Sequence, residues 1–285
     1  VDVKRFVASP FYQRMKESDP KSGPGAAFKE LEEKTGLNPE RDLESVYVAG
    51  RHPGAAGTPG GVVVVTGTFD RYKLSRSIET SGRKVTTKSV QGVSVYLFDE
   101  AKGRGQTGAV GFLEENLLVM GSLDDVEKVI ATRATGQGGI KSNPAMVALL
   151  ENVRPGSTFW MVGDQSVLDR VRGNVPAPGG GPAMALPGLK SMIVTGDLDP
   201  ELSLEITGEA QDEAAARQLA DVVRGFVALA QLQSSQKPEL KQLASAVSVT
   251  TEASRLRISA RFPYELLDAL KPKKPTDAAS AGGRH

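Results

Sequence analysis

The sequence predicts an α+β protein made of two related halves, each an antiparallel sheet with helices packed on one face, in a ferredoxin-like order. Three observations lead to this prediction. Apolar runs of strand length alternate with segments of helical periodicity. The turns between neighbouring strand candidates are short, which favours antiparallel pairing. The second half also repeats the series of segments found in the first, so we place the halves at residues 1–141 and 142–270, with a disordered tail at 271–285.

The elements of the first half follow from local signals. Val1-Asp2-Val3 has the pattern of a strand end. Gly36 ends a helix, because glycine readily adopts the left-handed conformation that closes helices. Ser122 is an N-cap, with Asp125 three residues further on as in a capping box. The predicted helices are 6–15, 26–35, 71–81 and 124–133, and the predicted strands are 45–49, 62–68, 85–87, 93–98, 109–113 and 117–121.

The second half shows the same kinds of signal. Asn143-Pro144 starts a helix, and Asp199-Pro200-Glu201 turns a hairpin. Trp160, the single tryptophan, is interpreted as a core residue of its strand. The predicted helices are 145–151, 167–171, 213–233 and 264–270, and the predicted strands are 159–162, 191–198, 202–209, 246–249 and 256–260.

The repeat is clearest where a strand ends and a helix begins. Thr66-Gly67 closes an apolar run in the first half, and Thr207-Gly208 closes one in the second. Further matching segments, such as 109–112 with 246–249, lie at nearly the same separation. This interval is far longer than the roughly 20–50 residues of solenoid repeats, so it indicates a duplicated domain. The alternative is two unrelated α+β halves with similar hairpins.

Composition and charge exclude several partners. The formal net charge is +1 and aromatic residues make up 5% of the chain, so we expect no nucleic acid partner. No apolar run approaches the roughly 18–20 residues needed to cross a bilayer, so we expect no transmembrane segment. The chain has no cysteine, which suits an extracytoplasmic protein and equally a cytoplasmic one.

The side chains that most often perform catalysis are scarce. His52 lies in a Gly/Pro loop, which is a poor platform for a catalytic triad, and His285 is the last residue. With no cysteine, a zinc site would depend mainly on carboxylates, although zinc prefers nitrogen and sulfur ligands. We therefore expect no catalytic residues, no cofactor and no metal, and we interpret the chain as a non-enzyme.

Three motif matches have simpler structural interpretations. The segment 103–108 fits G-x-G-x-x-G, but a strand pattern follows where a dinucleotide site needs a helix. Ser234-Ser235-Gln236-Lys237 fits S-x-x-K, but the partner strings S-D-N and K-T-G do not occur. The acids Asp197, Asp199 and Glu201 lack the Gly and Glu of a calcium loop and suit a hairpin turn.

The helix 213–233 carries the candidate partner face. Its last two turns are apolar on nearly every side, and the face comprises Phe226, Val227, Leu229 and Leu232. One interpretation is a helix wedged between a sheet and another helix. The other is an interface helix that binds a protein partner or mediates self-association.

Three segments carry a resemblance to known proteins: Thr-Gly-Leu-Asn-Pro-Glu-Arg-Asp-Leu at 35–43, Gly-Thr-Phe-Asp at 67–70 and Ser-Asn-Pro at 142–144. Together they resemble a group of uncharacterised exported bacterial proteins with a domain of unknown function. In those proteins an export or lipoprotein signal precedes a strand much like Val1–Val3. The resemblance implies a location and a fold style, not an activity.

The leading functional hypothesis is therefore a non-enzymatic protein of the periplasm or cell surface, exported and freed of its signal, that binds a protein partner or forms part of an assembly. A cytoplasmic location stays open. The alternative is a module that binds or carries a small apolar ligand in an enclosed pocket. A hydrolase that uses only carboxylates comes third, because it needs two acids about 5–10 Å apart in one cleft.

Overall fold

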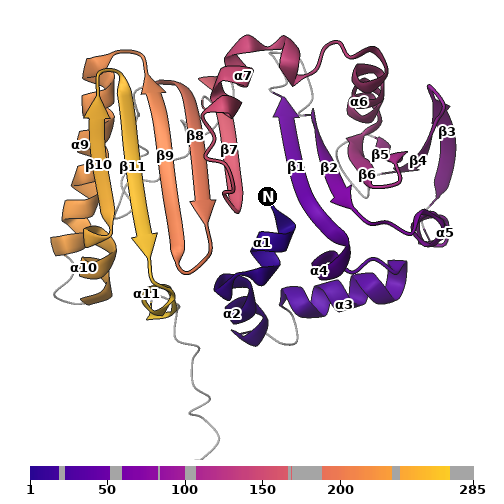
Figure 1. Cartoon of the computed structure of the whole chain (residues 1–285), viewed down its shortest axis with the longest axis horizontal. Helices are drawn as coiled ribbons and strands as arrows, with labels where there is room; N and C mark the ends of the chain where they lie inside the picture. Colours follow the sequence, from indigo (N-terminus) through magenta and orange to yellow (C-terminus); the bar gives the residue numbers. More distant parts are fainter. Residues whose placement is uncertain are drawn as a thin grey trace, which may run out of the picture.

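The computed structural model of the chain describes residues 1–18, 23–51, 60–82, 84–99, 107–165, 168, 188–232 and 238–269. Within these residues it confirms a mixed α+β architecture with two antiparallel sheets, one of six strands and one of five. The sheets lie next to each other, and the N-terminus lies between them (Figure 1). Several predicted features lie outside the described residues: the tail 271–285, positions 103–106 of the G-x-G-x-x-G match, the motif at 234–237, the helix predicted at 167–171 except residue 168, and both histidines.

The first sheet has the strand order β1-β2-β6-β5-β4-β3. The β3–β4 hairpin turns at Gln91 and Gly92, whose φ angles of 50° and 84° are typical of a two-residue hairpin loop. The strands are β1 (Leu43–Arg51), β2 (Gly60–Gly67), β3 (Val85–Val90), β4 (Val93–Asp99), β5 (Thr107–Glu114) and β6 (Leu117–Ser122).

Helices cover both faces of the first sheet. On one face, Val126 and Ile130 of α6 (Leu123–Thr135) pack against Val119. On the other face, Leu74 of α5 (Arg71–Glu79) packs against Leu118. The prediction that helices cover one face is therefore wrong for this sheet. The physical reason is that the central strands are apolar on both sides, so both sides need cover.

The second sheet has the strand order β10-β11-β9-β8-β7. Helices α9 (Glu213–Leu232) and α10 (Pro238–Ser245) pack on one face (Figure 1). On the other face, Arg255, Arg257 and Arg261 are exposed, and Arg257 pairs with Glu205 at 3.6 Å. The strands are β7 (Phe159–Asp164), β8 (Leu189–Asp197), β9 (Leu202–Ala210), β10 (Val247–Glu252) and β11 (Arg255–Phe262).

The ferredoxin-like order is not confirmed. A split β-α-β unit places another strand between the two strands that its helix connects. Here β7 lies at the edge of the sheet and pairs directly with β8, which follows it in the chain. The order of elements along the chain does not determine which strands become neighbours.

The N-terminal segment differs from its prediction in two ways. Only Asp2 forms a strand-like bridge, to Ser45, and α1 (Val3–Ala8) begins directly after it. The predicted helix 6–15 is divided into α1 and α2 (Pro10–Ser18). Proline disfavours helical geometry in the preceding residue, and Ser9 is accordingly extended.

The helices predicted at 26–35, 71–81, 124–133, 145–151, 213–233 and 264–270 lie close to their predicted positions, but the short helix at Pro39–Asp42 and helix α10 were not predicted. Gly36 closes α3 with a φ of 75°, and Ser122 caps α6 by accepting a hydrogen bond from the Asp125 N–H, both as predicted. The other helices are α3 (Pro24–Thr35), α4 (Pro39–Asp42), α7 (Pro144–Glu151) and α11 (Tyr264–Ala269), with a short 3₁₀ turn at Ile140–Ser142. Among the described helices, none is both long and apolar enough to cross a membrane.

Helix α2 joins the two halves. The Phe11 ring lies 6.1 Å from the ring of Tyr264 in α11. Arg14 forms ion pairs with Glu265, at 2.7 Å, and with Asp268. The boundary at residue 141 stays a prediction, but the N-terminal helices contact both sides of it.

Tyr12 is the centre of the N-terminal helical layer. Its side chain is fully buried, and its ring stacks on Phe28 at 6.2 Å and lies 5.3 Å from Phe6. The Tyr12 hydroxyl donates a hydrogen bond to the Glu40 carboxylate at 2.5 Å, and Lys16 donates a second at 2.9 Å. A buried phenol therefore connects α2, α3 and α4.

These contacts predict how stability depends on pH. Hydrogen bonds from Tyr12 and Lys16 hold the pKa of Glu40 below its ordinary 4.5. The stabilising contribution of Glu40 is therefore present above this ordinary pKa and is lost as the pH falls through the lowered one. Burial and the bond to Glu40 raise the pKa of Tyr12 above its ordinary 10.0. Its contribution is therefore complete below pH 10.0 and is lost as the pH rises toward the raised pKa.

We expect urea unfolding of the wild type to show both losses of stability. Tyr12→Phe should reduce the alkaline loss but not abolish it, because burial also raises the pKa of Tyr264. If Tyr12→Phe loses as much free energy of unfolding at alkaline pH as the wild type does, a group other than Tyr12 causes the loss.

Candidate functional site

Helix α9 is the scaffold of the candidate site. The Asp212 carboxylate accepts a hydrogen bond from the Ala215 N–H at 2.8 Å and thereby caps the first turn. Glu213 adds a negative charge where the helix dipole favours it, and it pairs with Arg217 one turn later. Local chemistry thus starts the helix, which continues for 20 residues.

One face of α9 is fixed to the second sheet. Ala216, Leu219 and Ala220 are buried and pack against Leu256 of β11. Two of these three helix residues are alanines, whose small side chains let the helix axis approach the sheet closely. Helix α10 contacts both α9 and β10, so it lies beside α9 on the same face of the sheet.

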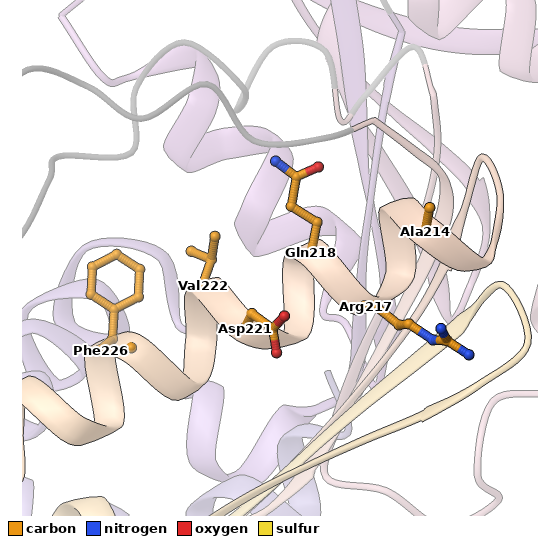
Figure 2. A pocket seen from close by; sticks show the side chains of 7 residues that line it. Ala214, Arg217, Gln218, Asp221, Val222 and Phe226 are labelled. Carbon is orange, nitrogen blue, oxygen red and sulfur yellow. The ribbon is translucent and has the colours of Figure 1, made fainter.

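The outer face of α9 carries an open hollow of about 710 Å³, which we call the α9 groove. Figure 2 shows Gln218, Val222 and Phe226 projecting to the same side, one turn apart, with Arg217 and Asp221 beside them. Among the described residues, none comes within 4 Å of a Cβ built at Gly225, so none of them covers the helix backbone there. The lining residues are Ala214, Arg217, Gln218, Asp221, Val222, Gly225 and Phe226.

The charges at the rim of the groove are paired within the helix. Asp221 accepts a hydrogen bond from Arg224 at 3.0 Å, and Arg217 pairs with Glu213. These side chains are mostly exposed, so each pair contributes little to stability. Their effect is to border an apolar row with both signs of charge.

The predicted partner face only partly coincides with this groove. Phe226 lines the groove and is half-buried. Val227 and Leu229 are also half-buried, but they are not among the groove residues. Leu232, at the end of the helix, is 78% exposed. The groove extends toward the start of α9, into a polar region. The predicted partner face does not include this region, because it was defined by apolar residues alone.

Gly225 offers a direct test of the bare backbone in the groove. Glycine inside a helix costs about 0.5–1 kcal/mol relative to alanine. Because the added methyl group meets no neighbour, we expect Gly225→Ala to raise the free energy of unfolding by about that amount. Urea unfolding measures the change. A decrease would mean that the helix backbone is strained at this position.

Two further hollows lie elsewhere on the described surface. One, of about 510 Å³, lies where β3 meets α6 and contains the acids Asp124 and Glu127. Glu127 is paired there with Lys88 at 2.7 Å, so it is held by a cation. The other, of about 200 Å³, lies between the N-terminus and Trp160. Trp160 is half-buried and its ring is 6.3 Å from Tyr47, so it belongs to a sheet edge and not to a core.

Within the described residues, no group of three or more His, Asp or Glu side chains is arranged to hold a metal ion. The acids Asp197, Asp199 and Glu201 lie at the β8–β9 turn, and Asp197 accepts a hydrogen bond from the Thr158 N–H at 2.9 Å. The part of the G-x-G-x-x-G match that is described begins a strand, β5.

We compared the chain with models of protein families, with curated proteins and with solved structures, and no significant match was found in any of the three comparisons.

Proposed function

We propose that this chain is a non-enzymatic protein of the cell envelope that binds a protein partner through the α9 groove. The observation that carries the proposal is that the lining residues of the groove within the described part of the chain all belong to one helix, α9. This described surface is open and runs along the helix, whereas ligand sites usually bury most of their ligand. This argues for a partner surface over a carrier pocket.

The form of the groove suits a helical partner. Gln218, Val222 and Phe226 form a row with the four-residue spacing of a helix ridge (Figure 2). A second helix packs against such a ridge at an axis distance of about 8–10 Å. Ala214 and Gly225 allow that approach because they add little or no side chain. The partner we propose is an amphipathic helix that places apolar side chains on this row.

The non-enzymatic part of the proposal is supported by the state of the charged groups. Asp221, an acid in the described lining of the α9 groove, is bonded to Arg224, and Glu127 in the hollow beside α6 is bonded to Lys88. Each carboxylate is already engaged by a neighbouring cation, whereas a general acid or base must be able to reach its substrate.

The envelope location is supported by the resemblance to exported bacterial proteins, and the lack of cysteine is compatible with it. Cell fractionation with an antibody to the chain tests it. We expect the protein in the periplasmic or membrane-associated fraction, and recovery from the cytoplasm alone would reject the location.

We also propose that the halves arose by internal duplication. The strand order β1-β2-β6-β5 has a counterpart in β8-β9-β11-β10. In the first half Val46 pairs with Val65, and in the second Val194 pairs with Ile206, at corresponding places in the two hairpins. The bridge from Asp2 to Ser45 corresponds to the pairing of β7 with β8.

Recovery of a partner from the native host tests the proposed function. A tagged chain is cross-linked gently in cells, purified and analysed by mass spectrometry. Ala214→Glu and Val222→Glu place a carboxylate in the groove. Thr250→Glu places one on the opposite, exposed face of the second sheet as the matched control.

We expect the wild type and Thr250→Glu to recover one stoichiometric partner, and both groove variants to lose it. As a control for folding, all four proteins must show the same thermal unfolding. Recovery of the chain alone, as a monomer, would contradict the proposal and direct attention to apolar ligands.

A further inference from the structure

The two sheets present facing edges to each other. β1 is the outermost strand of the first sheet and β7 is the outermost strand of the second (Figure 1). The rings of Tyr47 and Trp160, one from each strand, lie 6.3 Å apart. We call the space between residues 46–48 of β1 and residues 158–160 at β7 the edge slot.

Two residues of the chain already occupy one end of the edge slot as an extended strand. The Val1 amino group donates to the Val46 carbonyl oxygen at 2.8 Å, and the Val46 N–H donates back to the Val1 carbonyl oxygen at 2.9 Å. On the opposite side, the Asp2 N–H donates to the Thr158 carbonyl oxygen at 2.8 Å. An extended backbone at this place therefore bonds to both edges at once.

The edge slot offers the same backbone groups beyond Val1. Successive residues of a strand direct their N–H and C=O groups to alternate sides. Because Val46 directs its groups to the slot, so does Val48. Because Thr158 directs its carbonyl oxygen to the slot, Trp160 directs its backbone groups there too.

The side chains along the edge slot suit an added strand. Val48 is 76% exposed and Met161 is 47% exposed, although both are apolar. Exposed edge strands are usually protected from pairing by charged residues, prolines or bulges. Residues 45–50 of β1 and 159–163 of β7 contain no charged residue and no proline.

The Val1 amino group gives independent support. Burial in the slot lowers its pKa, which means that the slot disfavours a charge at this point. A peptide N–H in the same place donates the same hydrogen bond and carries no charge.

We infer that the edge slot is a strand-acceptor site, which takes one extended strand antiparallel to β1 in continuation of Val1 and Asp2. Its occupant is the polypeptide directly ahead of Val1, in any form of the chain that carries residues there. The bound strand joins the two sheets into one continuous sheet.

The register of this strand follows from the bridge between Asp2 and Ser45. The first residue ahead of Val1 lies opposite Tyr47 and shares the face of Tyr47 and Trp160. The second lies opposite Val48, on the face where Val48 and Met161 are exposed, so the slot selects an apolar, β-branched residue at this position.

The test compares the chain that begins at Val1 with one extended by four residues, Val-Thr-Val-Thr, ahead of Val1, so that a valine lies opposite Val48 and every added side chain is β-branched. Amide hydrogen exchange is measured at Val48 and Trp160, together with thermal unfolding. We expect exchange at both amides to slow at least about tenfold and the unfolding temperature to rise.

Val48→Pro is the matched control. It removes the one N–H that β1 directs to the slot at this point, and proline is tolerated on an edge strand where its missing N–H faces outward. It should leave the unextended chain nearly unchanged and cancel the gain from the extension. Unchanged exchange at Val48 in the extended chain would overturn the proposal. The proposal would also be overturned if a dimer protected the Val48 amide and the extension did not displace the second copy, because the occupant of the slot would then be that copy.

Discussion

Replacing Tyr12 by alanine is expected to lower the free energy of unfolding by about 3–5 kcal/mol, as for other large aromatic side chains removed from a core. The side chain is fully buried, and its removal leaves a cavity between Phe6 and Phe28. It also takes away one of the two donors that hold Glu40. Urea unfolding of the purified variant measures the loss.

Tyr12→Phe separates the two contributions. It keeps the ring and removes the hydroxyl, so only the hydrogen bond to the charged Glu40 is lost, which is worth about 1.5–3 kcal/mol. A loss below about 1 kcal/mol for Tyr12→Ala would contradict the account, because a core residue of this size cannot be removed so cheaply.

Replacing Leu219 by alanine is expected to cost about 2–5 kcal/mol and to loosen α9 from its sheet. Leu219 is 6% exposed and packs in the cluster with Ala216, Ala220 and Leu256. Because the neighbouring helix residues in this cluster are alanines, no larger side chain from α9 is available to fill the space. Unfolding in urea and the near-ultraviolet signal report the change.

Gln218→Ala is the control for Leu219→Ala, at the adjacent residue of the same helix. Gln218 is exposed and lines the α9 groove, so its truncation should change the stability by no more than about 0.5 kcal/mol. Equal losses for the two variants would contradict the orientation of α9, with 219 toward the sheet and 218 toward the groove.

Local signals predicted the elements well because the interactions that start and end them are local. Gly36 and Ser122 act on residues within one turn, and each caps its helix as predicted. Pro10 carried a local signal as well, and its effect on Ser9 explains why one predicted helix became two.

The arrangement of the elements could not be predicted in the same way, because it depends on contacts between distant residues. The hydrogen bond between Asp2 and Thr158 and the ion pair between Arg14 and Glu265 connect residues that lie far apart in the sequence. Trp160 was interpreted as a core residue because tryptophan is usually well buried, yet it lies at an edge beside Tyr47.

The candidate site was predicted only in part for a related reason. Phe226 was found because it is apolar, but apart from Val222 the other described groove residues are polar or small. Gly225 was the residue that could have indicated the groove from the sequence. Glycine inside a helix lowers stability, so its presence often has a packing or functional reason.

Site-specific photo-cross-linking in living cells tests the proposed partner surface most directly. A benzophenone side chain is introduced at Gln218, in the α9 groove, and in a parallel strain at Thr250, which is exposed on the opposite face of the second sheet. We expect one discrete cross-linked protein from position 218 and none from position 250. The same products from both positions, or none from position 218, would contradict the claim that the α9 groove binds a protein.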